Sequence, residues 1–299
     1  MILIADSGST KTDWTLLHST NPLLKSEEIA TFRTQGITPI HQTAGDIRDI
    51  IERELLPQLS SFPRAKLIAS GVLESPLLQN LHLFFYGSGC TPAHVPMMIQ
   101  LLNEELSPKT VEVHSDLMAA ARALCGHEAG MACILGTGAN SCLYDGEHIV
   151  QNTPALGYIL GDEGSGAVLG KHLLHDLYTG VLSQNIKATF ERETGMQLSE
   201  IINKVYRQPQ ANRFLASLSE FIHRHLDDEG IRQLVYTTFN DFCSYHLARY
   251  GRRDLPVSFV GSIAWYYQEQ LALILQMQGY EVGTIMQSPL QGLVAYHSN

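Results

Sequence analysis

Two short stretches rich in glycine and hydroxyl residues have the composition of phosphate-binding turns. They are Asp6-Ser7-Gly8-Ser9-Thr10-Lys11 and Gly136-Thr137-Gly138-Ala139-Asn140, and each follows a short apolar run. A tight turn of this kind can direct several backbone N–H groups at one anion. Either stretch alone is also explained as an ordinary hairpin turn. As a facing pair, the two turns could hold a triphosphate from both sides.

Acidic residues near these turns could supply the remaining chemistry of phosphate transfer. Asp6 ends the first apolar run, where a carboxylate can hold Mg²⁺ directly or through water. Asp116 begins a predicted helix, whose dipole keeps a carboxylate ionised, as a general base must be. Asp162 and Glu163, which lie between glycines, could bind sugar hydroxyls or a metal ion. The structural alternatives are an Asx turn at Asp6 and helix capping at the other positions.

A third glycine-containing turn could approach a nucleobase. Gly261 and Ser262 follow a predicted strand and precede a predicted helix, and such small residues allow close approach of a flat ligand such as adenine. The alternative is an ordinary strand–helix turn. The chain lacks the GxxxxGK[ST] pattern, which excludes a Walker A loop. The histidine pairs 172/175 and 223/225 lie in helical patterns whose spacing suits core or surface positions better than a metal site.

The elements that must position these residues follow from the hydrophobic pattern. Short apolar runs predict strands over residues 2–5, 12–17, 66–70, 84–86, 111–113, 131–135, 141–144 and 257–260. Helical periodicity predicts helices over residues 46–59, 117–124, 165–178, 263–276 and 289–296, and across most of 197–250. Strands that alternate with helices are typical of α/β architecture. The strand–turn–strand pattern occurs twice, about 130 residues apart, which indicates an internal duplication.

Length and composition limit the class of protein. The 299 residues suggest about two domains, and 44% hydrophobic with 17% charged residues is typical of a globular chain. The formal charge of -10, with no basic stripe, argues against a nucleic-acid partner. No apolar stretch approaches the length of a membrane span. The N-terminus has no signal-peptide pattern and the five cysteines form no CxxC pair, so we expect reduced thiols in a cytoplasmic protein.

The order of six motifs along the chain resembles a known superfamily. DSGSTKTDW, YGSGC, HSDLMAAA, LGTGANS, GDEGSG and VGSIA follow the order seen in the sugar kinase/heat-shock chaperone/actin superfamily. Within it, they most resemble the N-acetylglucosamine kinase branch of the BadF/BadG/BcrA/BcrD ATPase family. The resemblance implies two ribonuclease-H-like domains around a central nucleotide and sugar cleft. We expect the first domain over residues 1–114 and the second over 115–284, with a helical insertion at about 180–250 and segment 285–299 packing back on the first.

The resemblance also implies roles for single residues. Asp116 matches the family's catalytic base, and Asp6 would hold Mg²⁺. The implied phosphate-binding residues are Ser7, Gly8, Ser9, Thr10, Lys11, Gly136, Thr137 and Gly138, and the implied adenosine-binding residues are Gly261 and Ser262. The implied sugar-binding residues are Asp116, Thr137, Asn140 and Asp162. One departure concerns the family's sugar-binding Asn in the first domain, where this chain has Thr34-Gln35-Gly36-Ile37-Thr38-Pro39, so that Thr38 or Gln35 would take over its role.

The activity implied by the resemblance is ATP-dependent phosphorylation of an amino sugar, at the 6-hydroxyl of N-acetylglucosamine. N-acetylmuramic acid and glucosamine are alternative acceptors, because they require only small changes of the pocket. An ATPase that activates a redox partner is a further alternative, although no cluster-binding cysteine motif is present. A non-catalytic sensor would need a DNA-binding module, for which the chain offers no room before its first strand. The expected ligands are ATP, Mg²⁺ and an amino sugar, and a homodimer stays open because family members are often dimers.

Overall fold

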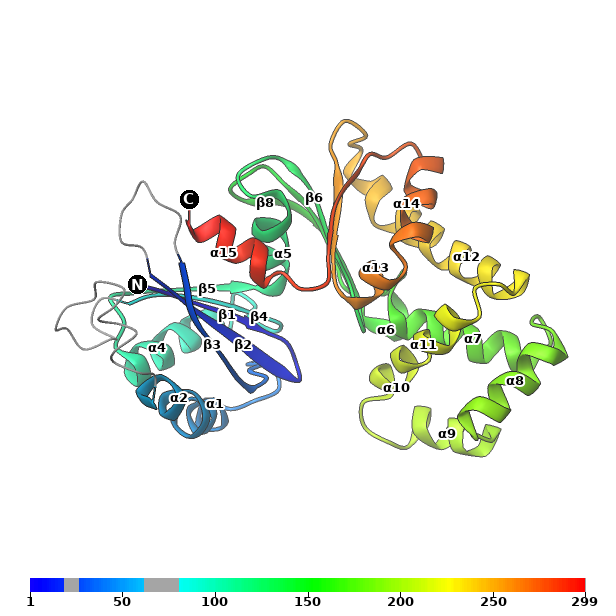
Figure 1. Cartoon of the computed structure of the whole chain (residues 1–299), viewed down its shortest axis with the longest axis horizontal. Helices are drawn as coiled ribbons and strands as arrows, with labels where there is room; N and C mark the ends of the chain where they lie inside the picture. The colour runs from blue at the N-terminus through cyan, green and yellow to red at the C-terminus, as the bar shows by residue number, and fades with distance from the viewer. Residues whose placement is uncertain (19–26, 62–80, 299) are drawn as a thin grey trace. The chain divides into compact units, whose positions relative to one another are not determined.

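The fold was analysed in a computed structural model that describes residues 1–18, 27–61 and 81–298. The strand predicted over residues 66–70 lies outside these residues. The chain divides into unit 1, made of Met1–His127 and Pro289–Asn299, and unit 2, made of Glu128–Ser288 (Figure 1). Both units are built on a mixed five-stranded sheet, which confirms the predicted α/β class. No helix in the described part of the chain has the length and apolar character needed to cross a membrane.

The sheet of unit 1 begins with a hairpin. β1 (Ile2–Ser7) pairs antiparallel with β2 (Lys11–His18), and β3 (Glu27–Gln35) pairs antiparallel with β2. On the other side of β1, β4 (His82–Gly87) and β5 (Thr110–Ser115) run parallel to it. The strand order is therefore β3-β2-β1-β4-β5, and the carboxyl ends of β1, β4 and β5 meet at one edge.

Helices cover both faces of this sheet. One face packs against α1 (Ala44–Ile50), a π-helical turn (Ile51–Leu55), α2 (Leu56–Ser61) and α4 (Val95–Leu106), as Figure 1 shows. The other face packs against α5 (Asp116–Cys125) and α15 (Leu290–Ser298). Alternation along the strands explains the division, because Leu3 and Ala5 belong to the first cluster whereas Ile4 belongs to the second.

Unit 2 repeats the topology of unit 1. β6 (Gly130–Leu135), β7 (Ala139–Tyr144) and β8 (Ile149–Thr153) pair antiparallel in sequence order. β9 (Val257–Val260) and β10 (Val282–Met286) continue the sheet parallel to β6 on its other side. Read from the other edge, the order is β8-β7-β6-β9-β10, which matches β3-β2-β1-β4-β5 strand for strand in direction. This match supports the internal duplication inferred from the repeated turns.

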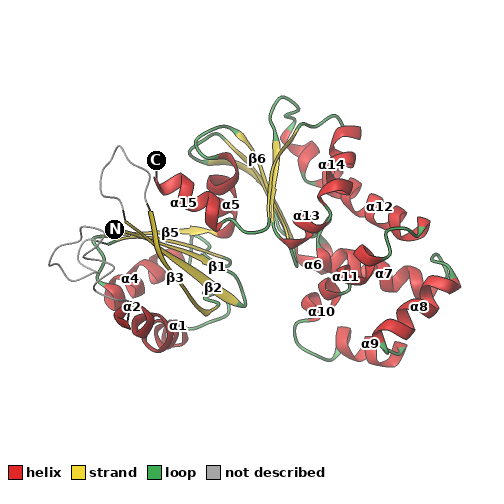
Figure 2. Ribbon diagram, in the orientation of Figure 1, coloured by secondary structure: helices red, strands yellow, loops and turns green. Residues whose placement is uncertain are grey.

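Helices make up most of the rest of unit 2 (Figure 2). They are α6 (Gly157–Leu160), α7 (Gly166–Thr179), α8 (Gln184–Thr194), α9 (Leu198–Tyr206), α10 (Ala211–Ser217), α11 (Ser219–Arg224), α12 (Glu229–Tyr245), a 3-10 turn (Leu247–Tyr250), α13 (Ser262–Tyr266) and α14 (Gln268–Met277). Large side chains such as Phe190, Phe239 and Phe242 form one core with the inner face of β6 and β9. The single helix predicted over residues 263–276 is interrupted at Tyr267, the residue between α13 and α14.

The C-terminal helix α15 completes unit 1 by close packing on α5. A Cβ at Gly292 would lie 2.3 Å from the carbonyl oxygen of Ala123, so only glycine allows this approach. His297 Nε2 lies 2.8 Å from the Tyr86 hydroxyl, which also accepts a hydrogen bond of 2.7 Å from Arg122. Because α5 packs on this unit, the division between units falls after His127, one helix later than the boundary expected at residue 114.

The burial of His297 predicts that unit 1 loses stability in acid. Burial, together with Arg122, His114 and His127, lowers the pKa of His297 to about 3. The unfolded chain, with a His pKa of about 6.5, therefore takes up this proton first, and stability falls as the pH drops below about 6.5. Between pH 7 and pH 5 we expect this group alone to remove about 2 kcal/mol of unfolding free energy.

Urea unfolding of the wild type and of His297→Asn at both pH values measures this effect. The variant should lose less stability than the wild type on acidification, although its stability at pH 7 falls because the hydrogen bond to Tyr86 is changed. An equal loss in both proteins would contradict the assignment.

Candidate active site

The first phosphate-binding turn predicted from sequence joins β1 to β2. Gly8 N–H donates a hydrogen bond of 3.0 Å to the carbonyl of Lys11, and residues 8–11 are exposed. The loop after β3 supports this turn, since Gly36 N–H donates to the Thr10 carbonyl at 3.1 Å. A Cβ at Gly36 would lie 2.3 Å from the carbonyl oxygen of Gly8. The backbone of the turn is therefore held by direct backbone contact with the loop.

Two side chains of the turn already have internal partners. The buried Ser7 hydroxyl lies 2.6 Å from that of Thr12 and donates to the carbonyl of Ile37 at 2.9 Å. Lys11 Nζ forms an ion pair of 2.5 Å with Asp13. The turn therefore offers phosphate its exposed backbone more readily than the Ser7 hydroxyl, and Lys11 would have to exchange Asp13 for a phosphate.

Three carboxylates gather at the carboxyl edge of the first sheet. Asp6 and Asp13 are register partners on β1 and β2, and Asp116 begins α5 directly after β5. Burial raises the pKa of Asp6 to about 7, with further contributions from the charges of Asp13 and Asp116, while Lys11 opposes the rise. Burial likewise raises the pKa of Asp116. Asp6, the predicted Mg²⁺ ligand, and Asp116, the predicted catalytic base, are thus close enough for the charge of Asp116 to raise the pKa of Asp6.

Asp6 fits the requirements of Mg²⁺, and Asp116 remains available as the base. This ion usually takes one or two carboxylates from a protein and the rest of its ligands from water and phosphates. The raised pKa of Asp6 indicates a buried anion that a cation would stabilise. Among the described residues, no group of three or more His, Cys, Asp or Glu side chains is arranged to hold a metal ion.

Helix capping at the start of α5 is performed by Ser115 rather than by Asp116. The Ser115 hydroxyl accepts a hydrogen bond of 3.3 Å from Met118 N–H. Asp116 Oδ1 accepts one from Leu117 N–H at 2.9 Å, which lowers its pKa but less than burial raises it. The capping alternative therefore does not account for Asp116.

The second predicted turn, between β6 and β7, is closed by a hydrogen bond of 3.0 Å from Gly136 N–H to the Gly138 carbonyl. Asp162 lies directly against it, because a Cβ at Gly138 would be 2.9 Å from Asp162 Oδ2. Ala139 N–H donates to this carboxylate, while burial is the largest effect and raises its pKa. Asp162 has a left-handed backbone, with φ of 58°. The structure therefore brings Gly138 and Asp162 together within unit 2.

Neighbouring residues hold the rest of this region. The Thr137 carbonyl accepts a hydrogen bond of 3.2 Å from Ala167 N–H at the start of α7. Ser165 caps α7, its hydroxyl accepting from Val168 N–H at 3.2 Å, so Asp162 is not the cap. Asn140 Oδ1 accepts from Ser141 N–H at 2.9 Å and from Asn152 Nδ2 at 3.0 Å, which fixes the orientation of its amide.

The predicted adenosine residues also lie next to this turn. Gly261 has φ of 124°, and a Cβ there would be 2.3 Å from the carbonyl oxygen of Leu135 at the end of β6. Ser262 begins α13 and lines a cavity of about 380 Å³. The other residues lining it are Ser219, Glu220, His223, Ile263, Tyr266 and Tyr267. A cavity with aromatic and polar side chains is suited to a nucleobase.

Of the two candidates for the missing sugar-binding Asn, Thr38 has a buried hydroxyl without a partner among the described residues, whereas the side chain of Gln35 is held by Glu54. Gln35 is tied to Glu54 by its backbone N–H at 2.7 Å and by its Nε2 at 2.6 Å. Thr38 is 7% exposed, and its Oγ1 has no hydrogen-bond partner among the described residues. A buried hydroxyl without a partner is unfavourable unless a ligand supplies one.

Some residues that shape these sites were not singled out from the sequence. Gly36 supports the first turn, Asp13 pairs with Lys11, and His246 pairs with Glu163, a residue that the sequence had indicated as a possible ligand. The sequence pointed to Gly36 only indirectly, as the glycine of the TQGITP stretch that replaces the family's sugar-binding loop. Lys11 and Asp13 have the i, i+2 spacing of same-face neighbours on a strand, whereas Glu163 and His246 are 83 residues apart and have no spacing signal.

Comparison with known proteins finds solved structures that resemble the chain over its full length. No protein-family model matches the chain, and no curated protein matches it. The chain is similar to the solved structure of a proposed N-acetylglucosamine kinase from Porphyromonas gingivalis, at 43% identity and a TM-score of 0.87, with 100% of this chain and 99% of the other covered. A second proposed N-acetylglucosamine kinase, from Chromobacterium violaceum, shares the fold at 18% identity and a TM-score of 0.70, with 99% and 98% covered.

Proposed function

Because the chain belongs to the N-acetylglucosamine kinase-like branch of the BadF/BadG/BcrA/BcrD ATPase family, we propose that it transfers the γ-phosphoryl group of ATP to the 6-hydroxyl of N-acetylglucosamine. The observation that carries this proposal is the full-length match at 43% identity. The amino sugar and the hydroxyl that is phosphorylated are the finer parts of the proposal. The position of Asp116 near Asp6, and of Asp162 against Gly138, supports it independently.

Asp116 is the proposed general base. As the sugar hydroxyl attacks the γ-phosphorus, its carboxylate accepts the hydroxyl proton, the bond from phosphorus to the bridging oxygen breaks, and ADP leaves. Burial raises the pKa of Asp116, which makes its ionised form a stronger base. Mg²⁺, when bound, neutralises charge on the phosphates, and Asp6 is the residue that would hold it.

The remaining predicted residues bind and orient the two substrates in this proposal. In this proposal the turns at residues 8–11 and 136–138 bind the phosphates through backbone N–H groups other than those of Gly8 and Gly136, which close the turns. The cavity beside Ser262 takes the adenine. Asp162, Asn140, Thr137 and Thr38 provide hydrogen bonds to the sugar. Positioning of this kind is most of what phosphoryl transfer requires from a protein.

A coupled ADP-release assay with MgATP tests the proposal. The acceptors are N-acetylglucosamine, N-acetylmuramic acid, glucosamine, N-acetylmannosamine and glucose, and the position of the phosphate on the product is read by NMR. Fast turnover of N-acetylglucosamine with phosphate at the 6-position is expected. Faster turnover of another amino sugar would replace the acceptor, and ADP release that no sugar changes would favour an ATPase acting on a different partner.

The Thr38 hydroxyl gives a specific prediction for the acceptor. Thr38→Val removes a buried hydroxyl that has no partner among the described residues, so stability should not fall, and could rise by about 1 kcal/mol. If the hydroxyl binds the sugar, KM for the acceptor should rise about tenfold while KM for ATP stays unchanged, since one lost hydrogen bond is worth about 1.5 kcal/mol.

Thr15→Val is the matched control. Thr15 lies on β2, is fully buried, and its Oγ1 likewise has no partner among the residues that the structure describes. The two substitutions should have similar effects on thermal unfolding, but only Thr38→Val should alter the acceptor KM. An unchanged acceptor KM in Thr38→Val would remove Thr38 from the sugar site.

A further inference from the structure

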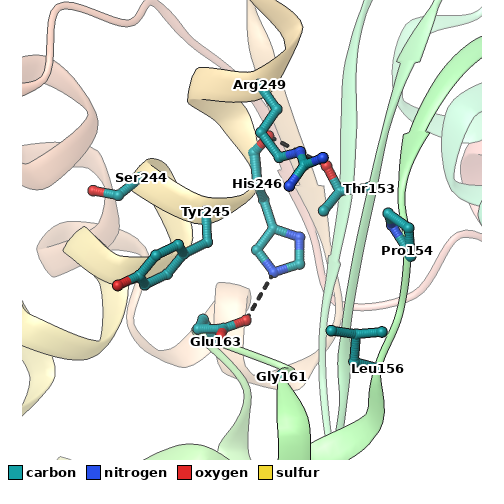
Figure 3. Close-up of a pocket in the computed structure, with 9 residues that line it drawn as sticks. All are labelled: Thr153, Pro154, Leu156, Gly161, Glu163, Ser244, Tyr245, His246 and Arg249. Carbon is teal, nitrogen blue, oxygen red and sulfur yellow. Dashed lines mark hydrogen bonds and ion pairs between the residues drawn. The ribbon is translucent and has the colours of Figure 1, made fainter.

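A histidine and a glutamate of unit 2 meet at the loop that carries Asp162. Glu163 Oε2 is 3.2 Å from Nε2 of His246, which is only 3% exposed. Figure 3 shows the two side chains facing each other at the wall of a pocket of about 290 Å³, with Arg249 above them. The mechanism above assigns neither residue a role.

His246 is one member of a chain of hydrogen bonds through the interior of unit 2. Thr153 N–H donates to the Tyr250 hydroxyl at 3.1 Å, and this hydroxyl lies 2.6 Å from Ser141 Oγ. Ser141 Oγ lies 3.4 Å from His246 Nδ1, and Nε2 then meets Glu163. The chain therefore links strands β7 and β8, the end of α12 and the loop before α7.

The donors in this chain can all point in one direction. A backbone N–H can only donate, so the Tyr250 hydroxyl accepts a hydrogen bond from Thr153 N–H. The hydroxyl can then donate its own hydrogen bond to Ser141 Oγ. Ser141 can then donate to Nδ1, which leaves a neutral His246 with its proton on Nε2, aimed at the Glu163 carboxylate. Burial lowers the pKa of His246, which favours this neutral form.

The loop held by this chain has an unusual backbone. Asp162 has φ of 58° and Gly164 has φ of 82°, and the Asp162 carbonyl accepts a hydrogen bond of 3.0 Å from Ser165 N–H. A left-handed backbone is unfavourable for a non-glycine residue and persists only where surrounding contacts fix it. Asp162 is fixed by its contact with Gly138 and Ala139, and Glu163 is fixed by its contact with His246.

We propose that Glu163 and His246 are positioning residues for the acceptor sugar. They hold the 161–164 loop so that the Asp162 carboxylate stays against Gly138, and neither touches the sugar. This inference rests on the proposed function, because the role of Asp162 as a sugar ligand comes from there. The observation that carries the proposal is that two adjacent carboxylates have different partners: Asp162 lies against Gly138 of the second turn, and Glu163 lies against His246.

Steady-state kinetics separate positioning from a purely structural role. Glu163→Ala and His246→Phe should each raise KM for the acceptor sugar by about tenfold to a hundredfold, because small misplacements of a binding group have effects of this size. KM for ATP should stay within about twofold, since the ATP residues are not held by this pair. Glu163→Gln should stay near the wild type, because its amide oxygen still accepts from His246 Nε2–H. Asp254→Asn, which removes an exposed ion pair with Arg252, is the control and should change neither KM.

The double variant Glu163→Ala/His246→Phe provides the second test. If the two residues act as one unit, its acceptor KM should match that of the worse single variant rather than the product of both effects. Tyr250→Phe breaks the same chain two hydrogen bonds away with little change of volume, and should raise the acceptor KM in the same direction. It stands in for His246→Phe if that variant does not fold.

The outcomes that overturn the proposal are distinct from failure of the proposed function. An unchanged acceptor KM in folded His246→Phe or Tyr250→Phe overturns it, as does a Glu163→Gln defect equal to that of Glu163→Ala, which would mean direct action of the carboxylate. If the wild type phosphorylates no sugar, the proposed function fails. Hydrogen exchange at residues 161–165 then tests the anchoring alone, with faster exchange expected in Glu163→Ala and equal exchange overturning it.

Discussion

Replacement of Asp116 by Asn should lower kcat by about a thousandfold while MgATP affinity stays within about twofold, because a general base contributes about 10²- to 10⁴-fold to rate. The amide keeps the shape of the side chain but cannot accept the hydroxyl proton. The variant should fold normally. The charge of Asp116 contributes to the raised pKa of Asp6, so its removal relieves repulsion rather than creating it.

Three measurements check this prediction together. They are kcat from the coupled assay, MgATP affinity from calorimetry, and thermal unfolding. Glu112→Gln is the control on the same strand, since Glu112 lies on β5 with an exposed side chain and pairs with His114. A kcat within tenfold of the wild type would remove Asp116 from the role of base, whereas loss of MgATP binding would indicate a role in holding the nucleotide.

Replacement of Gly36 by Ala should weaken ATP binding strongly, although Gly36 is not itself a predicted ligand. The added Cβ would lie 2.3 Å from the carbonyl oxygen of Gly8 and 2.8 Å from Thr10 N, both backbone atoms that cannot move independently of the turn. We expect KM for ATP to rise by about tenfold to a hundredfold, because the turn must shift. Overpacking of this kind should also lower the free energy of unfolding by about 1 to 3 kcal/mol.

Gly45→Ala is the matched control for this glycine. Gly45 lies in α1, where an added Cβ would meet only Thr43 Oγ1 at 3.7 Å, so alanine should fit and should stabilise the helix by about 0.5 to 1 kcal/mol. Kinetics are compared at a temperature where both variants are folded. Normal KM for ATP in Gly36→Ala would show that the turn tolerates displacement or does not bind phosphate.

Local patterns predicted most of the elements that carry the site. Both glycine-containing hairpins, the strand before Asp116 and the helix after it are visible as short apolar runs with turn residues between them. Of the described elements, β3, β8, β10, α4 and α6 were not predicted. Among the β3 residues whose side chains the structure describes, 30–35, Phe32 is the one large buried residue. α4 has a proline in its first turn, and β10 spans five residues that include Gly283.

The contacts that complete the site depend on tertiary packing. Glu163 and His246 are 83 residues apart, and no spacing rule joins them. A serine hydroxyl can bind phosphate, yet the hydroxyl of Ser7 donates a hydrogen bond to the carbonyl of Ile37 instead. The sequence favoured Thr38 with Gln35 as the alternative, and the contact of Gln35 with Glu54 could not be foreseen from it. Residue type and motif order therefore predicted which segments form the candidate site, whereas the hydrogen-bond partner of each side chain became visible only in the folded structure.

The completion of unit 1 by α15 has a consequence for synthesis on the ribosome. Unit 2 is one continuous segment, Glu128–Ser288, and can fold as soon as it leaves the exit tunnel. Unit 1 needs residues 289–298 to cover Ile4, Leu17 and Ala123, which pack against Leu293. One apolar face of unit 1 therefore stays exposed to solvent while all of unit 2 is translated. We expect nascent chains arrested before residue 289 to bind chaperones that recognise exposed apolar surface. Chains that include α15 should be released once this helix has docked.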